Sequence, residues 1–226
     1  FSADVNHDNK LDILVLTTQY SDRNSVSVLE NLGNAGFRAP QATPWGPTFI
    51  DAADFNGDGY KEFVSSWQTI YNNTSGVDIL INDRNGGLLP EISYSSPAAL
   101  SGMKTGDFNG DGKSDAVTCH SHNSRQIAVY FGNGSGTVAT PIITPFPDQL
   151  TNIFVADFNS DGKDDVFVVD ETSQGKLMLS TGLGTFTLAP GSPISILDST
   201  VELHVGDFNN DQHPDLVIAR DAAISI

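Results

Sequence analysis

The nonapeptide Asp107-Phe108-Asn109-Gly110-Asp111-Gly112-Lys113-Ser114-Asp115 decides how the rest of the chain is interpreted. Carboxylate or amide oxygens occupy its first, third, fifth and ninth positions. Because these positions alternate, their side chains can turn toward one point, and Gly112 supplies the positive φ that folds the loop back on itself. Hard oxygen donors without His or Cys suit Ca²⁺ better than Zn²⁺ or Cu²⁺. We therefore expect a calcium loop here.

The same nonapeptide occurs five times, with steps of 50, 53, 50 and 50 residues between successive copies. A period in this range indicates one supersecondary unit per repeat. We expect about one Ca²⁺ per repeat, up to five in total, held by side chains at positions one, three, five and nine and by the position-seven carbonyl. The expected ligands are Asp4, Asn6, Asp8, Lys10, Asp12, Asp54, Asn56, Asp58, Tyr60, Glu62, Asp107, Asn109, Asp111, Lys113, Asp115, Asp157, Asn159, Asp161, Lys163, Asp165, Asp207, Asn209, Asp211, His213 and Asp215.

The five loops are not equivalent at position six, where the backbone must turn. Asn9 stands there in the first loop, and Asn tolerates left-handed φ better than most residues. Gln212 stands there in the fifth loop, two residues before Pro214, so we expect a strained corner. In the second loop Glu62 replaces the closing Asp, and its extra methylene could still reach the ion. We expect loops two, three and four to hold calcium best and loop five to be weakest.

The charge of the chain is concentrated in these loops. The formal charge is −17, from 28 acidic against 11 basic residues, which argues against binding to nucleic acid or to an anionic membrane. Positions one, five and nine of the loops hold 15 of the 28 acids. Five bound Ca²⁺ ions would leave a net charge of about −7, an ordinary value for a protein surface.

Other sequence features bear on location. Cys119 is the only cysteine, so no intrachain disulfide can form. No signal peptide or membrane-spanning apolar run is present, and we expect no membrane insertion. Asn72, Asn73 and Asn133 head glycosylation sequons. Because extracellular calcium is millimolar and suits loops of this kind, we expect an extracellular protein, secreted or at the cell surface.

Each repeat is predicted to contain four short strands, because Val/Ile/Phe-rich runs with turn residues at both ends flank every loop. Strands entering loops are expected at Thr48–Asp54, Gly102–Asp107, Asn152–Asp157 and Val201–Asp207. Strands leaving loops are expected at Asp12–Thr17, Glu62–Trp67, Asp115–Cys119, Asp165–Asp170 and Asp215–Ala219. Third strands are expected at Ser25–Asn31, Val77–Asn82, Gln126–Phe131 and Lys176–Ser180. Gly- and Asn-rich turns then lead to a fourth, less regular strand.

These features resemble FG-GAP/VCBS repeats, the calcium-loop blades of integrin α-subunit heads and of many secreted microbial and fungal proteins. The resemblance rests on D-F-N-x-D-G-x-x-D, the D-[LVAF]-V strand after it and the N-x-G-x-G-x-F hairpin, and it covers essentially the whole chain. It implies an all-β fold, a β-propeller of four-stranded antiparallel blades with calcium loops between the first and second strands. We expect one domain over residues 1–226, with repeats at about 1–47, 48–100, 101–150, 151–199 and 200–226. About four and a half blades are present, which we expect to be part of a seven-bladed propeller in a larger chain.

Each of these features also has a simpler interpretation. An EF-hand needs Glu at position twelve and flanking helices, whereas position twelve here is Val15, Ser65, Thr118, Val168 or Ile218 between strands. Metal-free Asx-turn loops would leave clustered carboxylates to repel one another. Cys119-His120-Ser121-His122 is expected to be a solvated loop, not a metal site. Trp45, Trp67, Tyr71 and Tyr94 could stack on sugars, but packing is the simpler role, and Phe55, Phe108, Phe158 and Phe208 are expected in the core.

The function expected from the resemblance is a binding or adhesion module for a glycan or protein ligand, with structural calcium. Because the repeated acids are assigned to metal, no general acid–base pair stands out, and we expect no catalysis. Tyr20, Arg23, Trp45, Tyr71, Arg84 and His122 could present binding groups from the variable hairpins. Two alternatives remain open: the scaffold of a carbohydrate-active enzyme, such as a polysaccharide lyase or sugar dehydratase, and a structural filament or stalk subunit.

Overall fold

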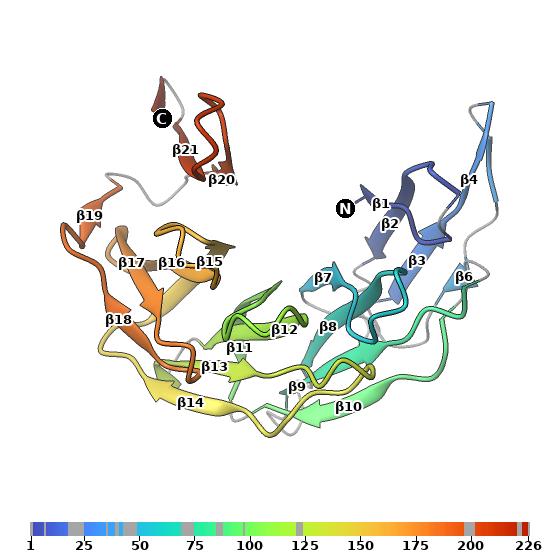
Figure 1. Cartoon of the computed structure of the whole chain (residues 1–226), viewed down its shortest axis with the longest axis horizontal. Helices are drawn as coiled ribbons and strands as arrows, with labels where there is room; N and C mark the ends of the chain where they lie inside the picture. Colours follow the sequence, from blue (N-terminus) through green and yellow to red (C-terminus); the bar gives the residue numbers. More distant parts are fainter. Residues whose placement is uncertain are drawn as a thin grey trace. The chain divides into compact units, whose positions relative to one another are not determined.

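The fold is all-β and is built from successive antiparallel sheets (Figure 1). The computed structural model describes residues 2–6, 8–17, 25–34, 36–38, 41–42, 49–68, 75–84, 88–96, 98–120, 124–196, 202–220 and 223–225. No α-helix occurs in these ranges, and they contain no helix long and apolar enough to cross a membrane. The four-stranded sheets are those of β-propeller blades, as the repeats predicted.

Each repeat contributes one main sheet. The first contains β1 (Ser2–Ala3), β2 (Asp12–Thr17), β3 (Ser25–Leu29) and β6 (Gln41–Ala42), and the second contains β7 (Ile50–Ala53), β8 (Glu62–Gln68), β9 (Ser75–Leu80) and β10 (Ile92–Ser95). The third contains β11 (Leu100–Gly106), β12 (Asp115–His120), β13 (Gln126–Tyr130) and β14 (Ile142–Pro145). The fourth contains β15 (Leu150–Ala156), β16 (Asp165–Asp170), β17 (Gln174–Ser180) and β18 (Phe186–Leu188), with β19 (Ile194–Ser195) also on β17. The fifth contains β20 (Glu202–Gly206), β21 (Asp215–Arg220) and β22 (Ala223–Ser225). In the first repeat, β4 (Asn31–Gly33) and β5 (Gly36–Phe37) form a separate two-stranded sheet.

The expected strand order is confirmed in every sheet. Strands β2 and β16 have the predicted bounds, and most of the others differ by one or two residues at an end. The chain runs antiparallel from each strand to the next, for example with Val117 of β12 opposite Val129 of β13. Each calcium-type loop joins the first strand of a sheet to the second, so that all five loops leave their sheets in the same way.

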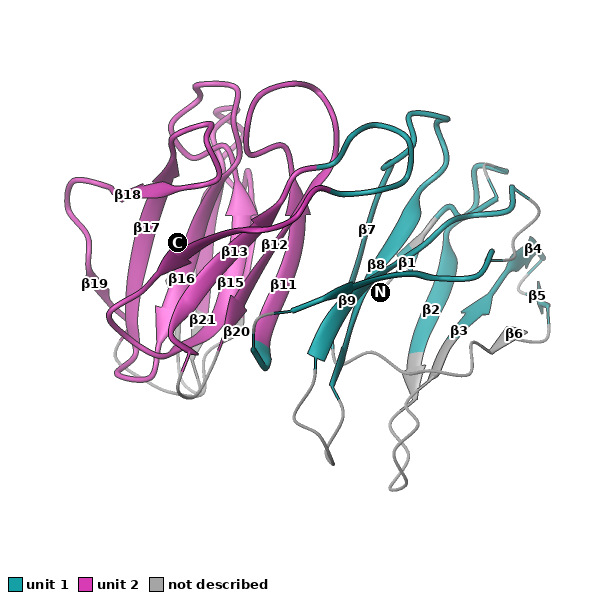
Figure 2. Cartoon of the chain, turned by 90° about the horizontal axis from the view of Figure 1, so that it is seen from below, with its two compact units in different colours: residues 1–100, 132–138 teal, residues 101–131, 139–226 magenta. Residues whose placement is uncertain are grey.

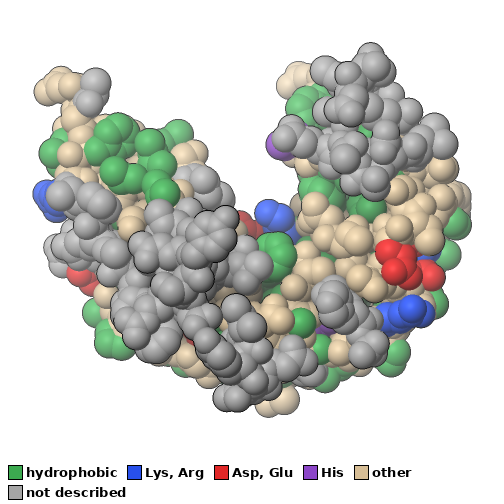
Figure 3. All heavy atoms as spheres, turned by 180° about the vertical axis from the view of Figure 1, so that it is seen from behind, with side chains coloured by type: hydrophobic (Ala, Val, Ile, Leu, Met, Phe, Trp, Pro, Cys, Tyr) green, Lys and Arg blue, Asp and Glu red, His purple; other side chains and the backbone are tan. Residues whose placement is uncertain are grey.

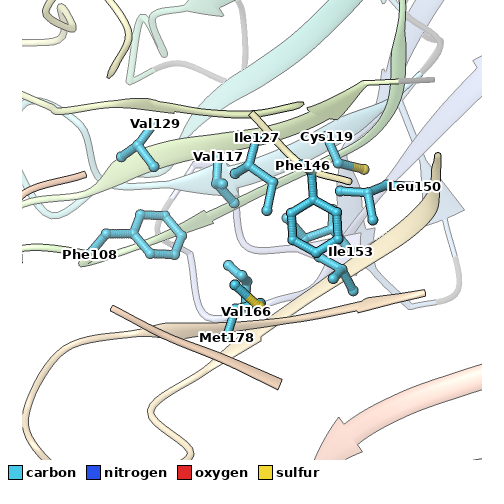
Figure 4. Close-up of a cluster of buried hydrophobic side chains, with 11 residues drawn as sticks. Phe108, Val117, Cys119, Ile127, Val129, Phe146, Leu150, Ile153, Val166 and Met178 are labelled. Atoms are coloured by element: carbon cyan, nitrogen blue, oxygen red, sulfur yellow. The ribbon is translucent and has the colours of Figure 1, made fainter. Parts of the chain in front are cut away.

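Two compact units are present, and each has its own core (Figure 2). One comprises residues 1–100 and 132–138, and the other comprises residues 101–131 and 139–226. In the first unit, Val5, Leu14 and Val28 pack with Ala52, Phe63 and Leu80. In the second, side chains of β12 and β13 pack with side chains of β15 to β17, and Figure 4 shows Phe108 and Val117 pointing toward Val166 and Met178.

Two expectations about buried residues are wrong in part. Phe55 and Phe108 are fully buried, but Phe158 is half-buried and Phe208 is 51% exposed. The same loop position is therefore core only where a following sheet covers it. Cys119 and His120 are fully buried on β12 instead of lying in a solvated loop. Burial raises the pKa of the Cys119 thiol to about 12, against the opposing hydrogen bond with Ser101, and so disfavours the nucleophilic thiolate form.

Trp67 and Tyr94, two of the aromatic residues considered for sugar stacking, make hydrogen bonds within the chain. Trp67 is half-buried, and its Nε1 donates to Asp78 Oδ1 at 3.0 Å. The Tyr94 hydroxyl accepts from the amide of Val138 at 3.1 Å. Trp45, Tyr71, Tyr20, Arg23 and His122 lie outside the described residues.

Candidate metal centres

The third loop is held in shape by its own side chains. The two carboxylate oxygens of Asp107 accept from the amides of Gly110, Asp111 and Gly112 at 2.8, 3.2 and 2.7 Å. Asn109 Oδ1 accepts from the Asp111 amide at 2.8 Å, and Asp111 Oδ1 accepts from the Lys113 amide at 3.0 Å. The side chains at positions one, three and five therefore fold the backbone around themselves.

All five loops share this pattern. In each, position one accepts from the amides of positions five and six. Position three accepts from the amide of position five, and position five accepts from the amide of position seven. The fifth loop keeps the pattern in spite of Gln212 and Pro214. The five copies are thus one structural motif, and not merely a repeated sequence.

The corner of each loop has the positive φ that was predicted. At position six, φ is 64° at Asn9, 88° at Gly59, 77° at Gly112, 82° at Gly162 and 71° at Gln212. A left-handed conformation costs an L-residue other than Gly about 1–2 kcal/mol, and less for Asn. Gln212 is therefore the strained corner of the set, as its sequence indicated.

We expect Gln212→Gly to stabilise the protein by about 1 kcal/mol, because glycine removes the left-handed strain while losing somewhat more chain entropy. That gain corresponds to a rise in melting temperature of about 2–4 °C for a chain of this size. The matched control is Gly112→Gln. An added Cβ at Gly112 meets no atom within 4 Å, so this change tests backbone strain alone and should lower the melting temperature by a similar amount. Equal melting temperatures for both variants and the parent protein would contradict the strain argument.

The closing acids at position nine are buried at the base of the loops. Asp12, Glu62, Asp115 and Asp165 are all 0% exposed, whereas Asp215 is half-buried. In four loops this carboxylate accepts from the position-two amide, at 2.8 to 3.0 Å. In the first and fourth repeats the closing acid also bonds the chain at the end of the third strand or just after it. Asp12 accepts from the Asn31 amide at 2.7 Å, and Asp165 accepts from the Ser180 amide at 2.8 Å. The closing acid therefore joins its loop to the sheet.

Burial disfavours the ionised form of the closing acids in loops two and four, and a bound cation would favour it. Burial raises the pKa of Glu62, against the hydrogen bond from the Phe55 amide. Burial likewise raises the pKa of Asp165, and the charges of Asp161 and Asp157 raise it further. Within the described part of the chain, Asp165 Oδ2 is buried and has no hydrogen-bond partner. A cation beside this oxygen would satisfy it.

Basic side chains pair with the position-five carboxylates. Lys10, Lys113 and Lys163, each at position seven, lie 2.6, 3.1 and 2.9 Å from the carboxylate two residues before them. In the second loop Arg84 of the following hairpin takes this role, 2.8 Å from Asp58. Hydrogen bonding to Lys10 lowers the pKa of Asp8. We expected nothing to offset the repulsion between the carboxylates of a metal-free loop. That expectation is incomplete, because a lysine or arginine side chain partly offsets this repulsion in four of the five loops.

The donor atoms of the loops fit calcium chemically, although their acidic side chains are not gathered into one cluster in the described residues. No group of three or more His, Cys, Asp or Glu side chains that could hold a metal ion occurs within the described ranges. However, each loop offers carboxylate and amide oxygens at positions one, three and five and a position-seven carbonyl, all hard donors. A carboxylate oxygen that accepts one amide can still coordinate an ion, because it has a second lone pair. Together with the unpartnered oxygen of Asp165, these donors suit Ca²⁺.

Contacts between neighbouring repeats, which the motif did not indicate, brace the loops. Ser180 Oγ donates to the Phe108 carbonyl at 2.7 Å, and the Gly136 amide donates to the Phe55 carbonyl at 2.9 Å. Asp164 of the fourth loop accepts from the Asp107 amide at 2.7 Å, and its own amide donates to the Asp107 carbonyl. The sequence feature that could have indicated such contacts is the polar or small residue at the start of each hairpin.

Of the asparagines that head glycosylation sequons, Asn133 lies exposed in one of these hairpins, whereas Asn72 and Asn73 are outside the described residues.

Comparison with known proteins identifies the repeat. The sequence profile described as FG-GAP-like repeat matches residues 4–65, 107–168 and 157–218. No curated protein matches the chain. The solved structures that resemble it include a crystal structure of BBS1N in complex with ARL6DN, soaked with lead, at 10% identity and a TM-score of 0.52. That alignment covers 98% of this chain and 64% of the other, so this chain spans less than two thirds of that chain's length. The likeness concerns the fold alone.

Proposed function

Because this chain belongs to the FG-GAP-like repeat family, we propose that it is a calcium-stabilised β-propeller module that binds a glycan or a protein ligand outside the cell. Family membership and the blade-like sheets support the scaffold. The observation that carries the calcium proposal is the hydrogen-bond pattern shared by all five loops, which orients oxygens at positions one, three and five in the same way each time. Oxygen-rich loops of this kind in extracellular modules bind calcium in the range of about 10⁻⁴–10⁻³ M.

In each loop the side chains at positions one, three and five, the position-seven carbonyl and the closing acid would hold the ion. When bound, Ca²⁺ supplies positive charge that neutralises these carboxylates. The residues of the chain do the structural work. Asp107 folds the loop, and Asp115 ties the loop to its sheet through the Phe108 amide at 3.0 Å. Such a loop fixes the angle between the first and second strands, and so makes the sheet a rigid support.

The proposed ligand contacts lie at the other end of the sheets. Side chains at the calcium end are engaged in hydrogen bonds within the loops, whereas connections at the opposite end carry exposed charge. Arg125 lies between β12 and β13, and Glu171 lies between β16 and β17, with their side chains 51% and 45% exposed. Arg125 is also anchored, because it donates to the Pro147 carbonyl at 3.1 Å. An anchored guanidinium beside a carboxylate can hydrogen-bond sugar hydroxyls or a polar peptide.

The test is a glycan array and a pull-down with defined extracellular proteins, run in calcium and again in EDTA. We expect saturable binding in calcium that Arg125→Ala weakens about tenfold, the loss of one charge-assisted hydrogen bond. Leu183→Ser, which changes an exposed residue in a hairpin at the calcium end, is the matched control and should bind like the parent protein. Binding to no glycan and no protein would contradict the proposal. Polysaccharide turnover abolished by one substitution that leaves the melting temperature unchanged would establish the enzyme alternative instead.

A further inference from the structure

Loops three and four, residues 107–115 and 157–165, belong to the same compact unit and contact each other directly. The contact centres on Asp164, the half-buried residue at position eight of the fourth loop. Asp164 Oδ2 accepts from the Asp107 amide at 2.7 Å, and the Asp164 amide donates to the Asp107 carbonyl at 2.8 Å. A single residue of loop four therefore holds both backbone polar groups of the residue that opens loop three.

The backbones of the two loops also approach closely on either side of this bridge. A Cβ added at Gly106 would lie 2.7 Å from Asp164 Oδ2. A Cβ added at Gly110 would lie 3.1 Å from Lys163 Cγ and 3.5 Å from the Gly162 carbonyl oxygen. A larger residue at either glycine would push the two loops apart, so the absence of a side chain there allows the bridge to form.

A second path joins the same two loops through Ser180 at the end of β17. The Ser180 amide donates to Oδ1 of Asp165, the closing acid of loop four, at 2.8 Å. The Ser180 hydroxyl donates to the Phe108 carbonyl of loop three at 2.7 Å. The Phe108 amide in turn donates to Asp115, the closing acid of loop three, at 3.0 Å. The two closing acids are therefore connected by successive hydrogen bonds.

The bridge made by Asp164 is specific to this pair of loops. An acid stands at position eight only in the fourth loop. The corresponding residues of the other four loops are Leu11, Lys61, Ser114 and Pro214. The bridge is therefore not a general property of the repeat.

The two loops that the bridge holds together are both strongly acidic. Few acidic side chains are visible on the face drawn in Figure 3, among the residues that the structure describes. Positions one, five and nine of the five loops, by contrast, hold 15 of the 28 acids of the chain. Like charges in neighbouring loops repel each other, so the contact through Asp164 holds the two loops together against this repulsion.

We propose that loops three and four bind calcium as a coupled pair, with Asp164 as the positioning residue between them. This inference rests on the proposed function, because it takes both loops as calcium sites. Asp164 stands between the Lys163 carbonyl and the Asp165 carboxylate, two of the expected ligands in loop four. When these two groups are fixed by a bound ion, Asp164 is fixed with them, and so is the backbone of Asp107. Part of the ordering that loop three needs is then already present, and loop three binds its own ion more tightly.

The coupling is measured by calcium titration of the intact chain, followed through the glycine amides in ¹H–¹⁵N NMR spectra. The Gly112 amide donates to Asp107 and reports on loop three, and the Gly162 amide donates to Asp157 and reports on loop four. Gly59 of loop two, in the other compact unit, is the reference.

Weakening one loop should weaken its neighbour. Asp161→Asn removes the charge of a ligand in loop four but keeps a side-chain oxygen for the Lys163 amide, so the loop should stay folded. We expect the calcium Kd reported by Gly112 to rise about fivefold or more, while the Kd reported by Gly59 stays unchanged. Because coupling free energies are reciprocal, Asp111→Asn in loop three should raise the Kd reported by Gly162 by the same factor.

Variants at position eight test the role of Asp164. With Asp164→Ala in place, Asp161→Asn should no longer change the Kd reported by Gly112. Asp164→Asn keeps an acceptor oxygen for the Asp107 amide and should retain the coupling. Ser114→Ala, at position eight of loop three, is the matched control and should also retain it. Circular dichroism checks that these variants fold, and the reciprocal test above needs no change at Asp164.

A measurement on the metal-free protein tests the positioning role separately. In excess EDTA, Asp164→Ala should speed hydrogen exchange of the Asp107 amide about tenfold, because the amide loses its acceptor. Ser114→Ala should leave that rate unchanged. An exchange rate that Asp164→Ala does not alter would overturn the assignment of the positioning role to Asp164.

The outcomes separate this inference from the proposed function. Calcium-dependent shifts at Gly112 and Gly162 with Kd values that ignore the change in the other loop would overturn the coupling and leave the calcium sites standing. Coupling that survives Asp164→Ala would overturn the role of that residue. The lack of any calcium-dependent shift at Gly59, Gly112 and Gly162 would overturn the proposed function and this inference together.

Discussion

Chelation of calcium should lower the melting temperature of this protein by about 10 °C or more. A ligand that binds only the native state at a hundred times its Kd contributes about 2.7 kcal/mol per site, and for a Kd of about 10⁻⁴ M this requires about 10 mM calcium. Each kcal/mol corresponds to about 2–4 °C for a chain of this size, so two occupied loops account for the shift. The loss has a structural cause. Without the ion, the buried carboxylates of Glu62 and Asp165 keep only amide donors, and burial raises the pKa of both groups.

The measurement is a thermal melt followed by circular dichroism, in calcium and in excess EDTA, with metal analysis to establish removal. Restoring calcium should restore the melt, and magnesium should do so less well because it dehydrates reluctantly and demands octahedral geometry. A variant with Asp111→Ala should lose more of the calcium-dependent stabilisation than one with Asp211→Ala, because loop five has the strained corner. An unchanged melt after verified removal would contradict a structural role for the ion.

Phe108→Ala should destabilise the protein by about 3–5 kcal/mol, the usual cost of removing a fully buried aromatic side chain. Phe108 is 0% exposed and packs edge-on against Phe186, with ring centroids 6.1 Å apart. The change leaves a cavity between the third and fourth sheets. We expect a fall in melting temperature of about 10 °C, measured together with denaturant unfolding.

Phe208→Ala is the matched control, since it removes the same side chain from the same loop position where it is 51% exposed. It should change stability by less than about 0.5 kcal/mol, because truncating a half-exposed side chain removes little buried packing. Similar losses for the two variants would show that the fifth loop is covered in solution and that our account of its exposed face is wrong.

Strands and loop shape were predictable because both depend on local sequence. The bounds of β2 and β16 followed from apolar runs that begin directly after a closing Asp. The positive φ at the loop corner followed from Gly at position six in three copies, and it persists at Asn9 and Gln212 because the Asx-type hydrogen bonds impose it.

The features that the sequence did not predict depend on contacts with other parts of the chain. Phe108 and Phe208 occupy the same loop position, and their burial differs because a following sheet packs on Phe108 but none packs on Phe208 within the described residues. His120 was expected in a loop, but β12 extends one residue further and buries it with Thr118, whose hydroxyl lies 2.9 Å from its Nε2. The pairing of Arg84 with Asp58 joins residues 26 apart in sequence, which no local pattern indicates.

Calcium titration of the metal-free protein by isothermal titration calorimetry tests the central claim most directly. We predict binding heats that saturate at four Ca²⁺ per chain, from loops one to four, and a weaker fifth site that Gln212→Gly strengthens. Asp107→Ala together with Asp157→Ala should remove two sites while the other loops still bind. No saturable heat at millimolar calcium, from a protein whose circular dichroism shows folded sheets, would contradict the assignment of these loops to calcium.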